Sequence, residues 1–158
     1  MPSKWTRHAT LAHSSTILSA FELIASRENL GPGTRQYWDR RSQYVSSEIR
    51  RIFSAIFGVD VDSLEGWKKL CTYVLGTTGV RLEELKTIKD CKKKLKDKFV
   101  NLIDLVEFAE RGEPLPTTLV FHSRKGLSKY TRNTKQFFPK EDAKELPLLR
   151  HFLITIFA

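Results

Sequence analysis

The stretch TRQYWDRRSQYVSSEIRRIFSAIF, residues 34–57, decides the fold, because it holds the longest amphipathic pattern in the chain. Its apolar side chains recur at steps of three and four residues, the period of a helix with one buried face. The predicted apolar stripe consists of Trp38, Val45, Ile49, Ile52, Phe53 and Ile56. The residues predicted to point away from it are Arg40, Arg41, Arg50 and Arg51. Gly58 is expected to end this helix.

Shorter helices are expected on both sides of this segment. They are predicted at residues 14–29, 62–76, 87–99, 101–112 and 123–138, followed by a last helix that begins at about Pro147. Polar residues that can accept from first-turn amides precede three of them, namely Asp62 with Glu65 three positions on, Thr87 and Asn101. The glycine at 76 can take the left-handed conformation that closes a helix.

These patterns predict an all-α fold, a compact bundle of six or seven short helices. The run TLVF at residues 118–121 is the only strand-like segment and is too short to carry a sheet. Residues 1–13 are expected to form a flexible N-terminus and residues 14–158 a single helical domain, with a candidate sub-boundary at 112–117, where Pro114 and Pro116 interrupt the chain. The predicted core comprises Phe21, Trp38, Ile52, Phe53, Trp67, Leu70, Cys71, Cys91, Leu95, Leu105, Phe138, Phe152 and Ile156.

The two cysteines, Cys71 and Cys91, fall on apolar faces of separate predicted helices. We therefore expect buried, reduced thiols and a reducing compartment. The start of the chain lacks the pattern of a secretory signal, which favours an intracellular address, nuclear or cytoplasmic. The alternative is an organelle transit peptide, because the first 21 residues contain no acid and are rich in Ser and Thr.

Common catalytic and metal-binding motifs are absent from the sequence. It contains neither GxxxxGK[ST] nor GxGxxG, and the loop GTTG at 76–79 lacks the lysine of a phosphate-binding loop. The two cysteines and four histidines are not spaced as zinc ligands, and apolar surroundings keep a thiol protonated and unreactive. We therefore predict that the protein is not an enzyme and uses no cofactor and no metal.

Three blocks of sequence resemble a family of small helical proteins from filamentous fungi. They are W-x-x-L-C at residues 67–71, V-N-L-x-D-L-V at residues 100–106 and F-P-K-x-x-A-K at residues 138–144. The resemblance covers most of the chain and departs from the family at Pro147, where its members have small residues. Because the family has no established activity, the resemblance implies a helical fold and a fungal source and implies no mechanism.

The basic residues are concentrated in two segments. Residues 86–98 and 124–140 contain 13 of the 27 Lys and Arg residues but only two acids, Asp90 and Asp97. Those segments carry +11, so the rest of the chain is about −2 although its net charge is +9. Closely spaced cations sum their fields on one region of the surface, which favours binding of an anion. The predicted binding residues are Lys89, Lys92, Lys93, Lys96, Arg124, Lys125, Lys129, Arg132, Lys135 and Lys140.

This arrangement suggests two functions. The first is a binding or regulatory module whose basic surface contacts an acidic protein partner. The second is a sequence-nonspecific nucleic-acid-binding protein that contacts backbone phosphates, since no sequence-reading motif is present. A solvated lysine-rich face with no partner is the third interpretation of the same residues. If the two basic helices lie side by side they form one patch, and if they lie on opposite sides the binding hypotheses lose most of their force.

Overall fold

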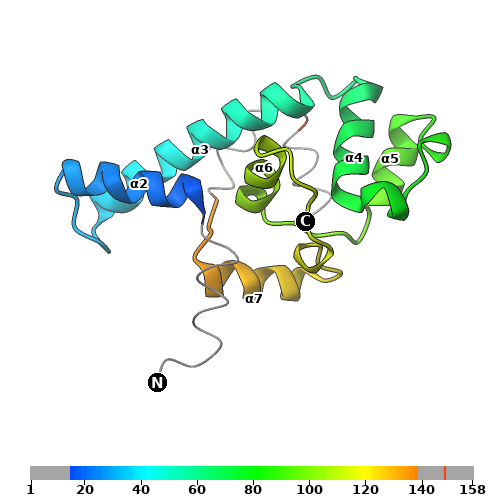
Figure 1. The fold of residues 1–158 in the computed structure, drawn as a ribbon. Helices are drawn as coiled ribbons and strands as arrows, with labels where there is room; N and C mark the ends of the chain where they lie inside the picture. Colours follow the sequence, from blue (N-terminus) through cyan, green and yellow to red (C-terminus); the bar gives the residue numbers. More distant parts are fainter. Residues whose placement is uncertain (1–14, 139–147, 149–158) are drawn as a thin grey trace.

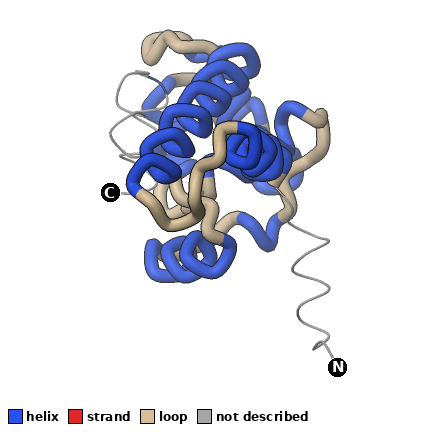
Figure 2. The backbone as a smooth tube through the Cα atoms, turned by 90° about the vertical axis from the view of Figure 1, so that its left-hand side faces the viewer, coloured by secondary structure: helices blue, strands red, loops and turns tan. Residues whose placement is uncertain are grey.

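The computed structural model describes residues 15–138 and Leu148, and six α-helices build this part of the chain (Figure 1). They are α2 (Thr16–Arg27), α3 (Arg35–Phe57), α4 (Leu64–Gly79), α5 (Ile88–Leu95), α6 (Leu102–Glu110) and α7 (Arg124–Thr134). Short 3-10 helices occupy Leu82–Glu84 and Thr117–Leu119. Within the described residues the only β-pairing is one antiparallel bridge between Phe99 and Phe121, and Figure 2 shows helices joined by loops. The predicted all-α fold is confirmed, and the predicted helix after Pro147 lies outside the described residues.

Helix α6 lies at the centre of the bundle. It packs against α3 and α2, while α4 packs against α3 and α5. Figure 1 shows α2 and the first half of α3 extending to the left, α4 and α5 at the right, and α7 along the bottom. All six residues from 102 to 107 are buried. The main core also includes Leu115 and Leu119, so apolar packing continues across residues 112–117.

Most of the predicted core is buried. This is confirmed for Phe21, Ile52, Phe53, Trp67, Leu70, Cys71, Cys91, Leu95 and Leu105. Phe138 is partly buried and packs against the core, while Phe152 and Ile156 lie outside the described residues.

The predicted orientation of α3 is wrong at two positions. Trp38 is 42% exposed, because the preceding residue, Tyr37, takes the inward position and packs edge-on against Phe21. Arg41 was expected to face solvent but is only 5% exposed. Residue 41 lies four positions before Val45 and so falls on the apolar stripe, where its side chain reaches the backbone carbonyls of a distant segment.

Two basic helices are shorter than their patterns indicate. Helix α5 ends at Leu95 rather than at residue 99, and Asp97 then takes a left-handed conformation with φ of 61°. Helix α7 ends at Thr134 rather than at residue 138, and Lys135 follows with φ of 58°. Aspartate visits this region more readily than most residues, which allows a sharp turn after α5.

The helix starts largely follow the predicted caps. The Thr87 hydroxyl accepts from the Asp90 amide, and the Asp90 carboxylate accepts from the Thr87 amide, which completes a capping box. Asn101 caps α6 as expected. The prediction for α4 is wrong by one residue, because the Ser63 hydroxyl accepts from the Gly66 amide, whereas the amide of residue 62 donates to the Asp60 carboxylate. Gly76, with φ of 73°, was expected to end this helix, but it forms a kink instead, and α4 continues to Gly79.

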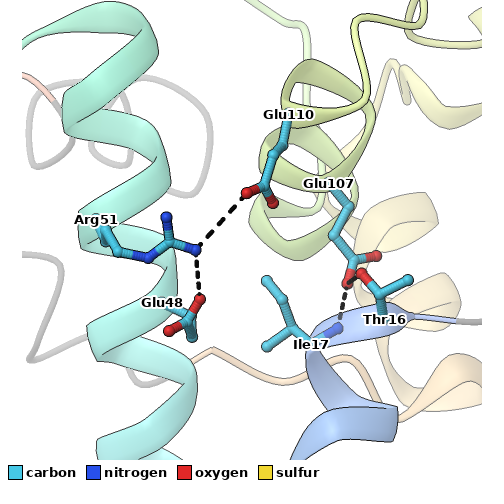
Figure 3. A network of polar contacts seen from close by, with 6 residues as sticks. All are labelled: Thr16, Ile17, Glu48, Arg51, Glu107 and Glu110. Carbon is cyan, nitrogen blue, oxygen red and sulfur yellow. Dashed lines mark hydrogen bonds and ion pairs between the residues drawn. The ribbon is translucent and has the colours of Figure 1, made fainter.

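A buried carboxylate of α6 fixes the start of α2 (Figure 3). One oxygen of Glu107 accepts from the Ile17 amide at 2.7 Å, the Ser15 hydroxyl at 2.7 Å and the Thr16 hydroxyl at 3.1 Å. Glu107 is 4% exposed, so these donors replace the water that an ionised carboxylate requires. One turn further on, Glu110 forms an ion pair with Arg51 of α3 at 3.6 Å.

The other end of α6 holds the last turns of α7 and the segment that follows. The Tyr130 hydroxyl donates to Asp104 at 2.6 Å, and the Gln136 side chain donates to Asp104 at 2.9 Å and to Asn101 at 3.2 Å. Arg41 donates to the carbonyl of Lys135 at 2.9 Å and to that of Phe137 at 3.1 Å. These contacts hold residues 130–137 against α6 and α3.

Candidate interaction surface

The outer face of α5 presents two lysines to solvent. Cys91 and Leu95 are fully buried against α4, and Lys93 projects from the opposite side of the helix with Lys89 beside it. Lys96 is also exposed but caps the helix rather than continuing it. Asp90, on the same helix, is already engaged by its capping box, and the Thr87 hydroxyl holds the pKa of that carboxyl below its usual range.

Two other lysines of α5 have intramolecular partners. The Lys92 ammonium lies 5.4 Å from the centroid of the buried Trp67 ring, within the range of a cation–π contact. The Lys94 ammonium pairs with Glu84 at 2.7 Å, and this contact lowers the pKa of the Glu84 carboxyl. Lys92, which sequence periodicity grouped with the binding residues, is therefore half-buried and contributes to the packing of α5 on α4.

Helix α7 presents a continuous row of cations. Leu127 is buried, and Lys125, Lys129 and Arg132 lie on the opposite side at steps of four and three residues. Arg124 is exposed at the flank of this row. The first turn of α7 contains no acid, so Arg124 and Lys125 face the positive end of the helix macrodipole, an arrangement that disfavours folding slightly.

The bridge between Phe99 and Phe121 joins the two basic segments. Each residue donates its amide to the carbonyl of the other at 2.8 Å, which holds the chain leaving α5 beside the chain entering α7. The Lys98 ammonium consequently lies 3.5 Å from Nδ1 of His122. The two helices do not lie side by side, since Figure 1 has α5 at the upper right and α7 at the bottom. Their basic segments are instead joined at their ends.

We call the cations on the two sides of this bridge the basic strip. It comprises Lys89, Lys93, Lys96, Lys98, Arg124, Lys125, Lys129 and Arg132. Within the described part of the chain, none of these residues forms an ion pair with an acid. Lys135 is exposed beyond the end of α7, and Lys140 lies outside the described residues. Lys98 and His122 were missed as binding candidates, because their proximity depends on a pairing between segments 22 residues apart.

The buried thiols form a separate pair inside the protein. Both Cys71 and Cys91 are buried and free, which confirms the predicted burial. The two helices that carry them pack together, with the Cys71 sulfur 3.9 Å from the Cys91 carbonyl oxygen. Burial raises the pKa of Cys71 to about 12 and also raises that of Cys91, so both stay protonated at neutral pH. This environment is unsuited to a nucleophile.

A cavity of about 800 Å³ runs along α4 between Leu82 and residues 114–117. Its walls are largely apolar, and its charged groups are Glu65, Lys68 and Lys69, of which the first two pair at 3.7 Å. The lining contains neither His nor Cys. Among the described residues, no group of three or more His, Cys, Asp or Glu side chains is arranged to hold a metal ion.

Comparisons with models of protein families, with curated proteins and with solved structures found no match to this chain. The resemblance to the fungal family therefore stays a prediction. Across residues 15–138, no helix is both long and apolar enough to cross a lipid bilayer.

Proposed function

We propose that the protein is a non-enzymatic helical binding module whose basic strip contacts an acidic segment of a partner protein. The observation that carries this proposal is the bridge between Phe99 and Phe121, which unites two cationic segments that are separate in the sequence. The strip is exposed on both sides of that bridge and lacks ion pairs with described acids. Its charges are therefore available to an external anion.

The energetics support a binding role for the strip. Like charges three and four residues apart on a helix repel by a few tenths of a kcal/mol per pair, and Lys125, Lys129 and Arg132 have this spacing. The cations in the first turn of α7 add an unfavourable interaction with the macrodipole. An acidic segment with carboxylates at matching helical spacing would offset both the repulsion between these cations and their unfavourable interaction with the macrodipole.

One feature favours an acidic protein over a nucleic acid. The rings of Phe121 and Tyr130 face each other with centroids 5.1 Å apart and are half-buried, so they offer no open stack between the cations. Proteins that bind single strands interleave such rings with basic residues.

The test compares two triple charge reversals that change the net charge equally. The strip variant carries Lys93→Glu, Lys125→Glu and Lys129→Glu, and avoids Lys92 because that side chain packs on Trp67. The control variant carries Arg27→Glu, Lys69→Glu and Arg81→Glu, three exposed cations outside the strip. The probe is a fluorescent oligo-glutamate peptide, followed by anisotropy.

We expect the strip variant to bind the peptide at least about tenfold more weakly than the wild type, and the control to stay within about twofold. Binding should weaken as salt is added, because exposed charges are screened. Equal losses in the two variants would mean that net charge rather than the strip controls binding. Much tighter binding of a duplex DNA of equal charge, with the same dependence on the strip, would favour the nucleic-acid function.

A further inference from the structure

We infer that Trp38 and Phe137 form an aromatic anchor site at the end of the basic strip, which receives an apolar side chain of the same acidic partner. This inference rests on the proposed function and specifies the partner's chemistry. It predicts an acidic segment that also carries an exposed aromatic or large aliphatic residue.

The Trp38 ring and the Phe137 backbone meet at one guanidinium group. The Arg41 carbon Cζ lies 5.4 Å from the centroid of the Trp38 ring, and the same guanidinium donates to the Phe137 carbonyl at 3.1 Å. Trp38 and Phe137 are nearly 100 residues apart in the sequence, so their proximity is a product of the fold. Trp38 is 42% exposed and Phe137 is 40% exposed.

The site is held in place before any partner binds. Arg41 is buried and donates to two carbonyls, including that of Lys135, which fixes the segment carrying Phe137. The Trp38 ring contacts Tyr37 edge-on, with centroids 5.5 Å apart. A side chain that is already fixed loses little conformational entropy when a partner binds. Trp and Arg are also enriched among the residues that contribute most of the binding free energy at protein interfaces.

The surroundings of the site match an acidic partner. Lys135 is exposed next to it and continues the row of cations from Arg132 at the end of α7. The nearby acids already have partners, since Glu22 accepts from the Tyr37 hydroxyl and Asp39 lies 3.8 Å from Arg35. Trp38 and Phe137, both exposed, are linked through Arg41 near the end of α7. This arrangement fits one apolar anchor flanked by carboxylates better than a series of stacked bases.

The experiment uses two labelled peptides that differ at one position. The first is the oligo-glutamate peptide, and the second carries one Phe near its end. We expect the wild-type protein to bind the Phe peptide about tenfold more tightly, because covering a phenyl ring recovers part of its transfer free energy. Trp38→Ala should abolish that difference while leaving the affinity for the plain peptide within about twofold. Phe137→Ala provides a second, independent variant.

The control is Leu82→Ala, which removes an exposed apolar side chain that lies outside the strip and outside the anchor site. It should preserve the tenfold preference for the Phe peptide. If the wild type binds both peptides equally, or if the preference survives in both Trp38→Ala and Phe137→Ala, the anchor site is refuted while the proposed function stands. If neither peptide binds, the proposed function itself fails. If a single-stranded oligonucleotide loses more affinity than the Phe peptide in Trp38→Ala, the rings stack on bases and the inference is overturned.

Discussion

Replacing Glu107 by alanine should destabilise the protein by about 3 kcal/mol. The carboxylate accepts from three donors at 2.7–3.1 Å, and a hydrogen bond to a charged group contributes about 1.5–3 kcal/mol. The three bonds share one oxygen atom, so their contributions are not additive. The value of about 3 kcal/mol corresponds to the loss of one strong hydrogen bond plus the cost of leaving the buried Ile17 amide without its acceptor.

Glu110→Ala is the matched control, since it removes the same side chain three residues further along the same helix. Glu110 is half-exposed and its nearest cation, on Arg51, is 3.6 Å away, so its loss should change stability by less than about 0.5 kcal/mol. Any difference in helix propensity between Glu and Ala is nearly equal at the two sites. Glu107→Gln, which keeps an acceptor oxygen, should fall between them.

Urea denaturation followed by circular dichroism gives the free energy of unfolding for each variant. For a chain of this size, about 3 kcal/mol corresponds to a fall in Tm of about 10 °C. If Glu107→Ala and Glu110→Ala lose the same free energy, the carboxylate of Glu107 does not hold α2 in place and the account of α6 is incorrect.

Trp67→Ala should destabilise the protein by about 3–5 kcal/mol, because the ring is fully buried and its Nε1 donates to the Val61 carbonyl at 2.8 Å. Trp38→Ala should cost less than about 1 kcal/mol in the same urea assay, and equal costs would contradict the assigned exposures. Labelling of Cys71 by a thiol reagent should be slow in the native protein and fast in denaturant, whereas rapid native labelling would show an accessible thiolate. Because burial raises the pKa of Cys71 to about 12, its contribution to stability should be constant below about pH 8.5 and fall as the pH rises from there toward 12. Over that range the thiol of the unfolded chain loses its proton before the thiol of the folded chain does. The stability of Cys71→Ala should therefore fall less steeply with pH than that of the wild type, as measured by urea denaturation across the same pH series.

Helical periodicity predicted which residues form the helices and most of the core, because burial along a helix follows local spacing. The prediction of burial from periodicity failed where a charged residue occupies a position that faces the core. Arg41 occupies an apolar position of α3 and is buried only because carbonyls from a distant segment satisfy it. Lys92 likewise sits on the buried Trp67 rather than facing solvent. These contacts depend on tertiary packing, which sequence spacing does not encode.

The candidate surface was predictable in composition but not in layout. The sorting of cations on α5 and α7 is a local property of each helix and can be read from spacing. Their junction depends on the pairing of Phe99 with Phe121, and no local signal marks that pairing. The polar positions of α6 did leave a signal, since Asn101, Asp104 and Glu107 recur every three residues through an otherwise apolar run.

The polar side chains of α6 also determine when a chain emerging from the ribosome can complete its core. The donors that reach Glu107 precede α6 in order of synthesis, but Tyr130 and Gln136 are made after it. A nascent chain that stops after α6 would have to bury Asp104 without those two donors, at a substantial desolvation cost. Such a chain would leave the apolar face of α6 exposed, and exposed apolar surface promotes aggregation of incompletely folded chains. The native core therefore closes only once residues 130–136 are free to pack against α6.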